Sequence, residues 1–199
     1  MKSIKKLLLL SLSTALLATS SIAVNAANWQ LAKDESTISF FSVKKGKIGE
    51  THTFTDFSGE INKGKAAVTI KADSVDTNVP IRNDRAREFL FETGIYPTIS
   101  ISSDVGDALK TASKGATSKL SIPATLSLHG VEKEVSLDVS ITRNGKGAIT
   151  VSNSKPVVIK AADYNMDAGV LKLAELVGGI PIASAVPVSF VLTFKKDKS

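Results

Sequence analysis

The stretch "SKLSIPATLSLHGVEKEVSLDVSIT", residues 118–142, decides the fold because it holds two alternating segments joined by a short turn. In the first segment an apolar face opposes a polar one: Leu120, Ile122, Ala124, Leu126 and Leu128 against Lys119, Ser121, Thr125 and Ser127. The second segment repeats the pattern: Val135, Leu137, Val139 and Ile141 against Ser136, Asp138 and Ser140. A period of two is typical of half-buried strands, and "HGVEK" predicts a tight β-hairpin between them.

The same patterning recurs along most of the chain. Further strands are expected over residues 37–44, 54–61, 66–75, 98–105, 148–159 and 186–194. Turns are expected at "INKGK", "GDALKTASKG" and "TRNGKG". Many short strands joined by Gly, Asn and Lys turns indicate an all-β antiparallel sandwich or barrel.

Two segments break the alternation and predict short helices. In "NDRAREFLF", Asn83 is expected as the N-cap, with Asp84 near the positive helix end. In "DAGVLKLAELVGG", Asp167 is expected as the cap, and the helix is expected to stop at two glycines. Its predicted apolar stripe consists of Val170, Leu171, Ala174 and Val177. Without an internal repeat or linker, one domain is the economical interpretation.

The N-terminal segment, residues 1–26, has the layout of a cleaved secretory signal peptide. A basic start precedes an apolar core at residues 7–17 and small residues near Ala26. We expect cleavage after Ala26, with Ala27 as the alternative, a mature domain over residues 27–199, and a periplasmic or secreted location. The apolar core is short and interrupted by Ser and Thr, so stable membrane insertion is not expected.

Composition excludes several classes of protein. Removing the signal peptide lowers the formal charge from +6 to +3, and no dense basic patch with stacking aromatics is present, so no nucleic-acid partner is expected. The sequence has no cysteine, which excludes disulfides, a thiol nucleophile and Cys-ligated metals. Stability must therefore come from a packed core, for which the chain is long enough. The sequence leaves open whether the protein forms a homodimer.

Catalytic and metal motifs are incomplete. "GEINKGKA", residues 59–66, approaches a phosphate-binding loop, but Ala66 replaces the hydroxyl residue that would hold magnesium, and the segment joins two strands. The two histidines, His52 and His129, lack the spacing of a helical metal site. We expect no enzyme, no catalytic or metal-binding residue, and no cofactor apart from a non-covalently bound isoprenoid or other lipid.

Four segments keep an order and spacing that resemble a known family. They are "STISFFSVKKGKIGETHTFTDFSGEI", "VTIKADSVDT" with the helix and Tyr-Pro that follow, "ATLSLHGVEKEVSLDV" and "AADYNMDAG". Together they resemble the YceI family of bacterial periplasmic proteins, from about Trp29 to Phe194. The resemblance implies an elongated eight-stranded antiparallel, lipocalin-like β-barrel with one or two short helices. It also implies a binding or carrier protein for a long-chain lipid or isoprenoid.

Whether the barrel is hollow depends on its inward-facing volume, because eight strands can either be filled by side chains or hold one slender ligand. The candidate inward faces mix large and small residues: Phe40, Phe54, Phe57, Phe190 and Phe194 with Ala67, Ala72 and Ala124. This mixture favours a ligand channel over a filled core, and the resemblance implies an isoprenoid, an isoprenoid quinone or a fatty-acyl compound as the ligand. A structural or stress-response interaction module with a filled core, and an enzyme acting on isoprenoids, remain the alternatives.

Candidate ligand contacts gather near "SVDTNVPIRNDRAREFLFETGIYP", residues 74–97. Arg82 and Arg85 could meet an anionic head at the barrel rim while Phe89 and Phe91 line the entrance. The favoured alternative is that Arg82 or Arg85 pairs with a nearby aspartate, Asp76 or Asp84, and only pins the loop.

Four further candidates lie on the strands and the hairpin turn. Phe40 and Phe54 are expected on the barrel interior. His52 alternates with Phe54 and could contact a ligand head near the mouth. His129 is a further candidate ligand contact, although a structural role in the turn, with a hydrogen bond to the backbone, explains this residue well.

Overall fold

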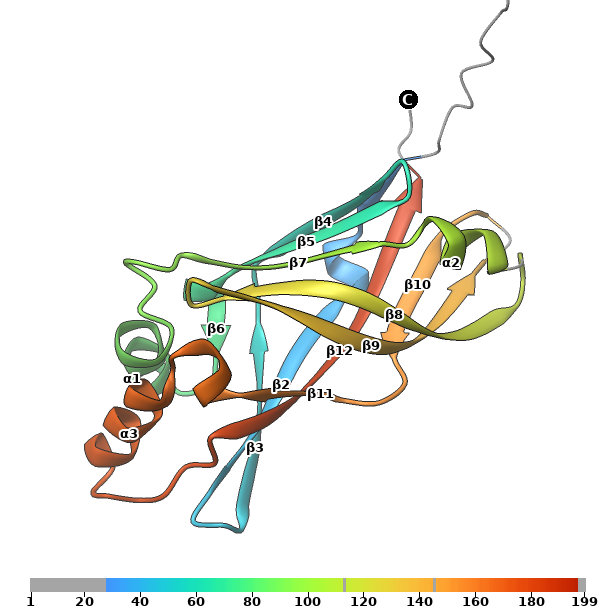
Figure 1. The fold of residues 1–199 in the computed structure, drawn as a ribbon. Helices are drawn as coiled ribbons and strands as arrows, with labels where there is room; N and C mark the ends of the chain where they lie inside the picture. The colour runs from blue at the N-terminus through green and yellow to red at the C-terminus, as the bar shows by residue number, and fades with distance from the viewer. Residues whose placement is uncertain (1–27, 113, 145, 197–199) are drawn as a thin grey trace, which may run out of the picture.

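A computed structural model describes residues 28–112, 114–144 and 146–196, and the expected signal peptide lies outside these residues. Strands wrap around one interior, with short helices at its ends (Figure 1). The strands are β1 (Trp29–Leu31), β2 (Thr37–Lys44), β3 (Ile48–Phe54), β4 (Phe57–Asn62), β5 (Lys65–Lys71), β6 (Val75–Asp76), β7 (Thr98–Asp104), β8 (Thr117–Leu128), β9 (Val131–Arg143), β10 (Ile149–Asn153), β11 (Val157–Lys160) and β12 (Ala185–Lys196).

These elements combine into eight long antiparallel strands, because β1–β2, β3–β4, β5–β6 and β10–β11 are each one strand with a short interruption. Each long strand pairs with the next along the chain, and β12 pairs with both β1 and β2, which closes the ring. The predicted eight-stranded antiparallel barrel is confirmed. Closure gives each long strand a partner on both sides over part of its length, so none of the eight is the edge of an open sheet.

The β8–β9 hairpin forms where the sequence predicts it. Leu128 pairs with Val131 across a two-residue loop, in which His129 and Gly130 have φ values of 51° and 74°. Positive φ at both positions is the hallmark of a type I′ turn, whose twist matches that of the flanking strands. The turn at "INKGK" is likewise confirmed, with positive φ at Lys63 and Gly64.

One predicted strand boundary and one predicted face are wrong. The strand expected from Phe54 in fact begins earlier: β3 covers residues 48–54, a segment whose polar residues concealed its strand character. Ala67, expected inside, is exposed, and its neighbour Ala66 lines the interior instead. Because side chains alternate, a shift of one residue moves a whole strand to its other face.

The described residues include three α-helices, where one or two short helices were expected: α1 (Pro80–Arg85), α2 (Gly106–Thr111) and α3 (Asp167–Leu176). Four shorter helical turns accompany them: η1 (Lys33–Glu35), η2 (Ala72–Ser74), η3 (Ala86–Leu90) and η4 (Ala161–Tyr164). The N-cap of α3 is Met166 and not the expected Asp167. Helix α2 occupies a segment expected to be only a turn. The structure describes no helix long and apolar enough to cross a membrane within residues 28–112, 114–144 and 146–196.

The start of α1 differs from the prediction. Its N-cap is Val79, and Pro80 takes the first helical position, where its missing N–H removes no helical hydrogen bond. Asn83 lies inside the helix and accepts hydrogen bonds from the backbone N–H and hydroxyl of Thr77, at 2.7 and 2.6 Å. The side chain therefore ties α1 to the strand before it.

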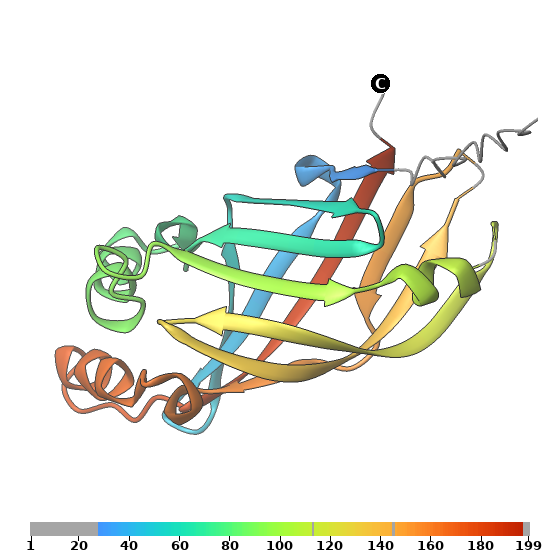
Figure 2. The same cartoon turned by 45° about the horizontal axis from the view of Figure 1, so that its top comes forward.

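Helix α3 packs against η3, the π-helical turn that continues α1. Gly169 makes this contact possible: a Cβ there would lie 2.3 Å from the Phe89 carbonyl oxygen. The predicted apolar stripe is partly wrong, because Leu171 is 70% exposed while Val170, Leu173 and Val177 face the interior. The two helical segments thus lie together at one end of the barrel (Figures 1 and 2).

Candidate functional site

The barrel encloses a cavity of about 620 Å³, so side chains do not fill its interior. This volume falls within the range of about 300–1,000 Å³ that small-molecule pockets show. The wall is mostly apolar, formed by the inward positions of nearly every strand, among them Val139, Ile141, Val151, Phe190, Leu192 and Phe194.

The cavity runs the length of the barrel. Leu109 of α2 lines one end, and Arg85 of α1 with Leu173 of α3 lines the other. Figure 2 shows α2 and the α1/α3 pair on opposite sides of the strands. The exposed residues Lys45 and Ile48 also belong to the wall, so the cavity reaches the surface beside the β2–β3 hairpin.

The inward face of this hairpin changes from apolar to mainly polar toward its tip, where Ile48 is the one apolar exception. Along β2 the inward positions are Ile38, Phe40, Ser42 and Lys44, and along β3 from the same end they are Phe54, His52, Glu50 and Ile48. Phe40 pairs with His52, and Ser42 with Glu50. The hairpin therefore offers an apolar surface in the barrel and hydrogen-bonding groups near the opening.

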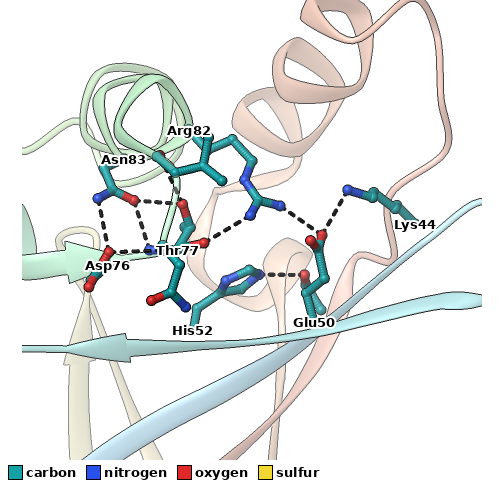
Figure 3. A network of polar contacts seen from close by, with 10 residues as sticks. Lys44, Glu50, His52, Asp76, Thr77, Arg82 and Asn83 are labelled. Carbon is teal, nitrogen blue, oxygen red and sulfur yellow. Dashed lines mark hydrogen bonds and ion pairs between the residues drawn. The ribbon is translucent and has the colours of Figure 1, made fainter.

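Arg82 joins this polar end to α1 (Figure 3). Its Nη1 donates to Glu50 Oε2 at 2.7 Å, and its Nη2 donates to the Thr77 carbonyl at 2.8 Å. Lys44 Nζ lies 2.8 Å from the same Glu50 oxygen. Hydrogen bonds from Arg82 and then Lys44 lower the pKa of Glu50 from 4.5 to about 2, so this carboxylate stays charged. The predicted pairing of Arg82 with Asp76 or Asp84 is wrong, since its partner is a residue of β3.

His52 is buried beside this network, with a relative exposure of 6%. Its Nε2 lies 2.8 Å from Ser42 Oγ, and its Nδ1 has no hydrogen-bond partner among the described residues. Burial, and then the positive charge of Arg82, lower its pKa below the usual 6.5, so the ring is neutral near pH 7. Its ring packs against Phe40, with centroids 5.1 Å apart.

The aromatic candidates divide into two groups. Phe40, Phe54 and Phe91 pack against one another and line the cavity, with ring centroids 5.6 to 6.4 Å apart. Phe89 lies outside this wall and borders a smaller hollow between η3, α3 and the β8–β9 turn.

His129 also lies away from the main cavity. Its Nε2 contacts Glu92 Oε2 at 2.7 Å, and its Nδ1 lies 3.1 Å from the Tyr164 carbonyl oxygen. Tyr96 packs against its ring. These contacts agree with the interpretation of His129 as a turn residue held by a backbone hydrogen bond.

Of the predicted arginines, both Arg82 and Arg85 line the cavity, whereas Arg87 pairs with Asp84 on the surface at 3.0 Å. Sequence reasoning missed Lys44 and Glu50. Their spacing could have identified them. Lys44 lies four positions after Phe40 and Glu50 four positions before Phe54, and residues an even number apart on one strand share a face.

The described part of the chain contains no cluster of side chains that could bind a metal ion. Across residues 28–112, 114–144 and 146–196, no three His, Asp or Glu side chains gather closely enough to hold an ion. The charged groups at the cavity end instead suit hydrogen bonding and charge neutralisation of an organic ligand.

Comparison with models of known protein families identifies one family that matches this sequence. A sequence model of the YceI-like domain matches residues 29–194. No protein with a curated description matches the chain.

Solved structures share the fold. A polyisoprenoid binding domain from Saccharophagus degradans, described as implicated in plant cell wall breakdown, is 35% identical with a TM-score of 0.81, over 85% of this chain and 98% of that one. BcnA from Burkholderia cenocepacia is 22% identical with a TM-score of 0.65, over 82% of this chain and 98% of its own, a likeness of fold alone.

Proposed function

Because this chain belongs to the YceI-like domain family, as its sequence segments predicted, we propose that it is a periplasmic binding or carrier protein for one long-chain apolar compound. An isoprenoid, an isoprenoid quinone or a fatty-acyl compound would lie along the barrel interior with its polar head at the β2–β3 end. The barrel sequesters this compound without transforming it.

The observation that carries the proposal is the cavity of about 620 Å³ with its apolar wall. Each methylene removed from water contributes roughly 0.8 kcal/mol, so a chain of about ten buried carbons gains enough to offset the cost of ordering it. The likeness to the polyisoprenoid binding domain of S. degradans, at 35% identity, supports the same class of ligand.

Organic extraction followed by mass spectrometry tests this function on the mature protein purified from a bacterial periplasm without detergent. We expect a long-chain compound at a stoichiometry near one per protein. Native mass spectrometry of the same sample should show the matching mass increase. Protein that is repeatedly empty, and that binds none of the long-chain compounds offered to it, would overturn the proposal.

A further inference from the structure

The charged part of the cavity wall is confined to the end formed by the β2–β3 hairpin and α1. Among the described residues, four cations and one carboxylate line the cavity: Lys44, Lys45, Arg82 and Arg85 with Glu50. Glu50 already contacts two of the cations, Arg82 and Lys44, at 2.7 and 2.8 Å. This end of the wall therefore keeps an excess of positive charge.

Of the four cations, Lys45 and Arg85 have no ion partner among the described residues, and Arg85 is the less exposed of the two. It is partly buried, and it forms no ion pair or side-chain hydrogen bond with any residue that the structure describes. An apolar chain covering the guanidinium would remove it from water, which is costly for an unpaired charge. A negative charge on the ligand would offset that cost.

Two buried polar atoms at the same place independently indicate a missing partner. His52 Nδ1 and Arg82 Nε are both buried and make no hydrogen bond among the described residues. Both side chains line the cavity, and Figure 3 shows the Arg82 guanidinium beside the His52 ring. Buried polar atoms in native proteins nearly always have a partner, so the orphaned atoms point to a polar ligand group.

We propose that the bound compound is an anionic amphiphile, whose carboxylate or phosphate head binds to Arg82 Nε, Arg85 and His52 while its chain fills the barrel. This inference rests on the proposed function. Guanidinium groups suit such heads because they donate parallel hydrogen bonds to two oxygens. When the Ser42 hydroxyl donates to His52 Nε2, His52 Nδ1 carries the proton and donates to the head as well.

A neutral head group would leave some of the hydrogen-bonding capacity and charge of Arg82, Arg85 and His52 without a partner. A hydroxyl or quinone oxygen could accept one hydrogen bond from Arg82 or His52, but it would leave the charge of Arg85 uncompensated. Charge-assisted hydrogen bonds are about twice as strong as neutral ones. The preference should therefore appear as tighter binding of an acid than of an alcohol with the same chain.

The test compares three compounds with the same sixteen-carbon chain on delipidated mature protein: hexadecanoate, hexadecyl phosphate and hexadecanol. Affinity is measured by displacement of the uncharged dye N-phenyl-1-naphthylamine. We expect at least one of the two acids to bind tenfold or more tightly than the alcohol, with the preference shrinking as salt is raised. Comparing the two acids identifies which anion fits.

The matched variant is Arg85→Gln. Arg85 forms no ion pair or side-chain hydrogen bond with a described residue, so the substitution should leave the fold intact. It should remove most of the preference for the acid, because the acid should lose several-fold more affinity than hexadecanol loses. Arg87→Gln, on the same helical segment but facing Asp84 at the surface, should retain the preference. A second readout is the His52 pKa, followed by NMR, which an acid should raise and the alcohol should not.

The outcomes separate the two proposals. Equal affinity for acids and alcohol, unaffected by Arg85→Gln, would overturn the anionic head while the lipid-binding function stands. Failure of all three compounds to displace the dye, together with empty protein on extraction, would overturn the function itself.

Discussion

Arg82 of α1 donates a 2.7 Å hydrogen bond to Glu50 of β3, a contact that joins residues 32 positions apart and fixes the helix to the mouth of the barrel. The same carboxylate contacts Lys44 of β2. One acidic side chain thus holds two strands and a helix around the polar end of the cavity (Figure 3).

Glu50→Gln should destabilise the protein at neutral pH and lose this effect in acid. The folded carboxyl has a pKa of about 2 against a usual 4.5, so its contribution is complete above pH 4.5 and disappears as pH falls toward 2. Allowing for solvent screening, we expect a loss of about 1–2 kcal/mol at pH 7. Urea unfolding from pH 2 to 7 measures it, with the exposed Glu132→Gln as control; a constant difference across this range would contradict the prediction.

His52 should make stability fall below pH 7. Its folded pKa lies below 6.5, so the unfolded chain binds the proton more readily, and stability is full above pH 6.5 and decreases as pH falls through it. In His52→Gln, the decline between pH 7.5 and 5 should be smaller than in the natural protein. Urea unfolding of ligand-free protein at each pH provides the comparison, and parallel profiles would refute the prediction.

Gly169→Ala should weaken the packing of α3 on η3. A helical Gly→Ala change ordinarily stabilises by about 1 kcal/mol, but here the new Cβ would lie 2.3 Å from the Phe89 carbonyl oxygen. We expect a net loss of about 1–3 kcal/mol, as in other overpacked sites. Gly94→Ala is the control, because nothing lies within 4 Å of its added Cβ. Thermal and urea unfolding give the answer; a more stable Gly169→Ala protein would show that the close approach does not exist.

Val157→Phe and Val158→Phe form a matched pair on β11. Val157 lines the cavity, whereas its neighbour Val158 faces outward and is 59% exposed. The inner substitution should reduce retained long-chain ligand several-fold because the ring occupies part of the channel; the outer one should not. Extraction and mass spectrometry measure retention, and thermal unfolding shows that both proteins fold. Equal retention by the two variants would mean that the chain does not pass β11.

His129→Asn should affect stability and leave the ligand in place. Asn tolerates the positive φ of this position, so the turn persists, but the 2.7 Å contact with Glu92 is lost. We expect a loss of about 1–2 kcal/mol. Retained ligand should match that of the natural protein, because His129 lies outside the cavity wall. Loss of ligand without loss of stability would instead restore His129 as a ligand contact.

The sequence predicted best where local pattern decides the structure. The alternation in residues 118–142 requires only that one face be apolar, and the His129-Gly130 turn needs only two residues with positive φ. The β3 segment was missed because its inward positions include Glu50 and His52, which break the apolar alternation. Local rules fail there because the cavity mouth needs polar groups on its inner face.

By itself the sequence determined an antiparallel all-β fold and the aromatic character of the interior, because side-chain alternation and turn chemistry act over neighbouring residues. The eight-stranded barrel was implied by the resemblance of four sequence segments to the YceI family. Only the tertiary structure decided that Arg82 meets Glu50, that Arg85 also faces the cavity, and that His129 does not. Those relations depend on strand register and on where α1 meets the barrel. Contacts between residues far apart in the chain set both, and no local pattern encodes them.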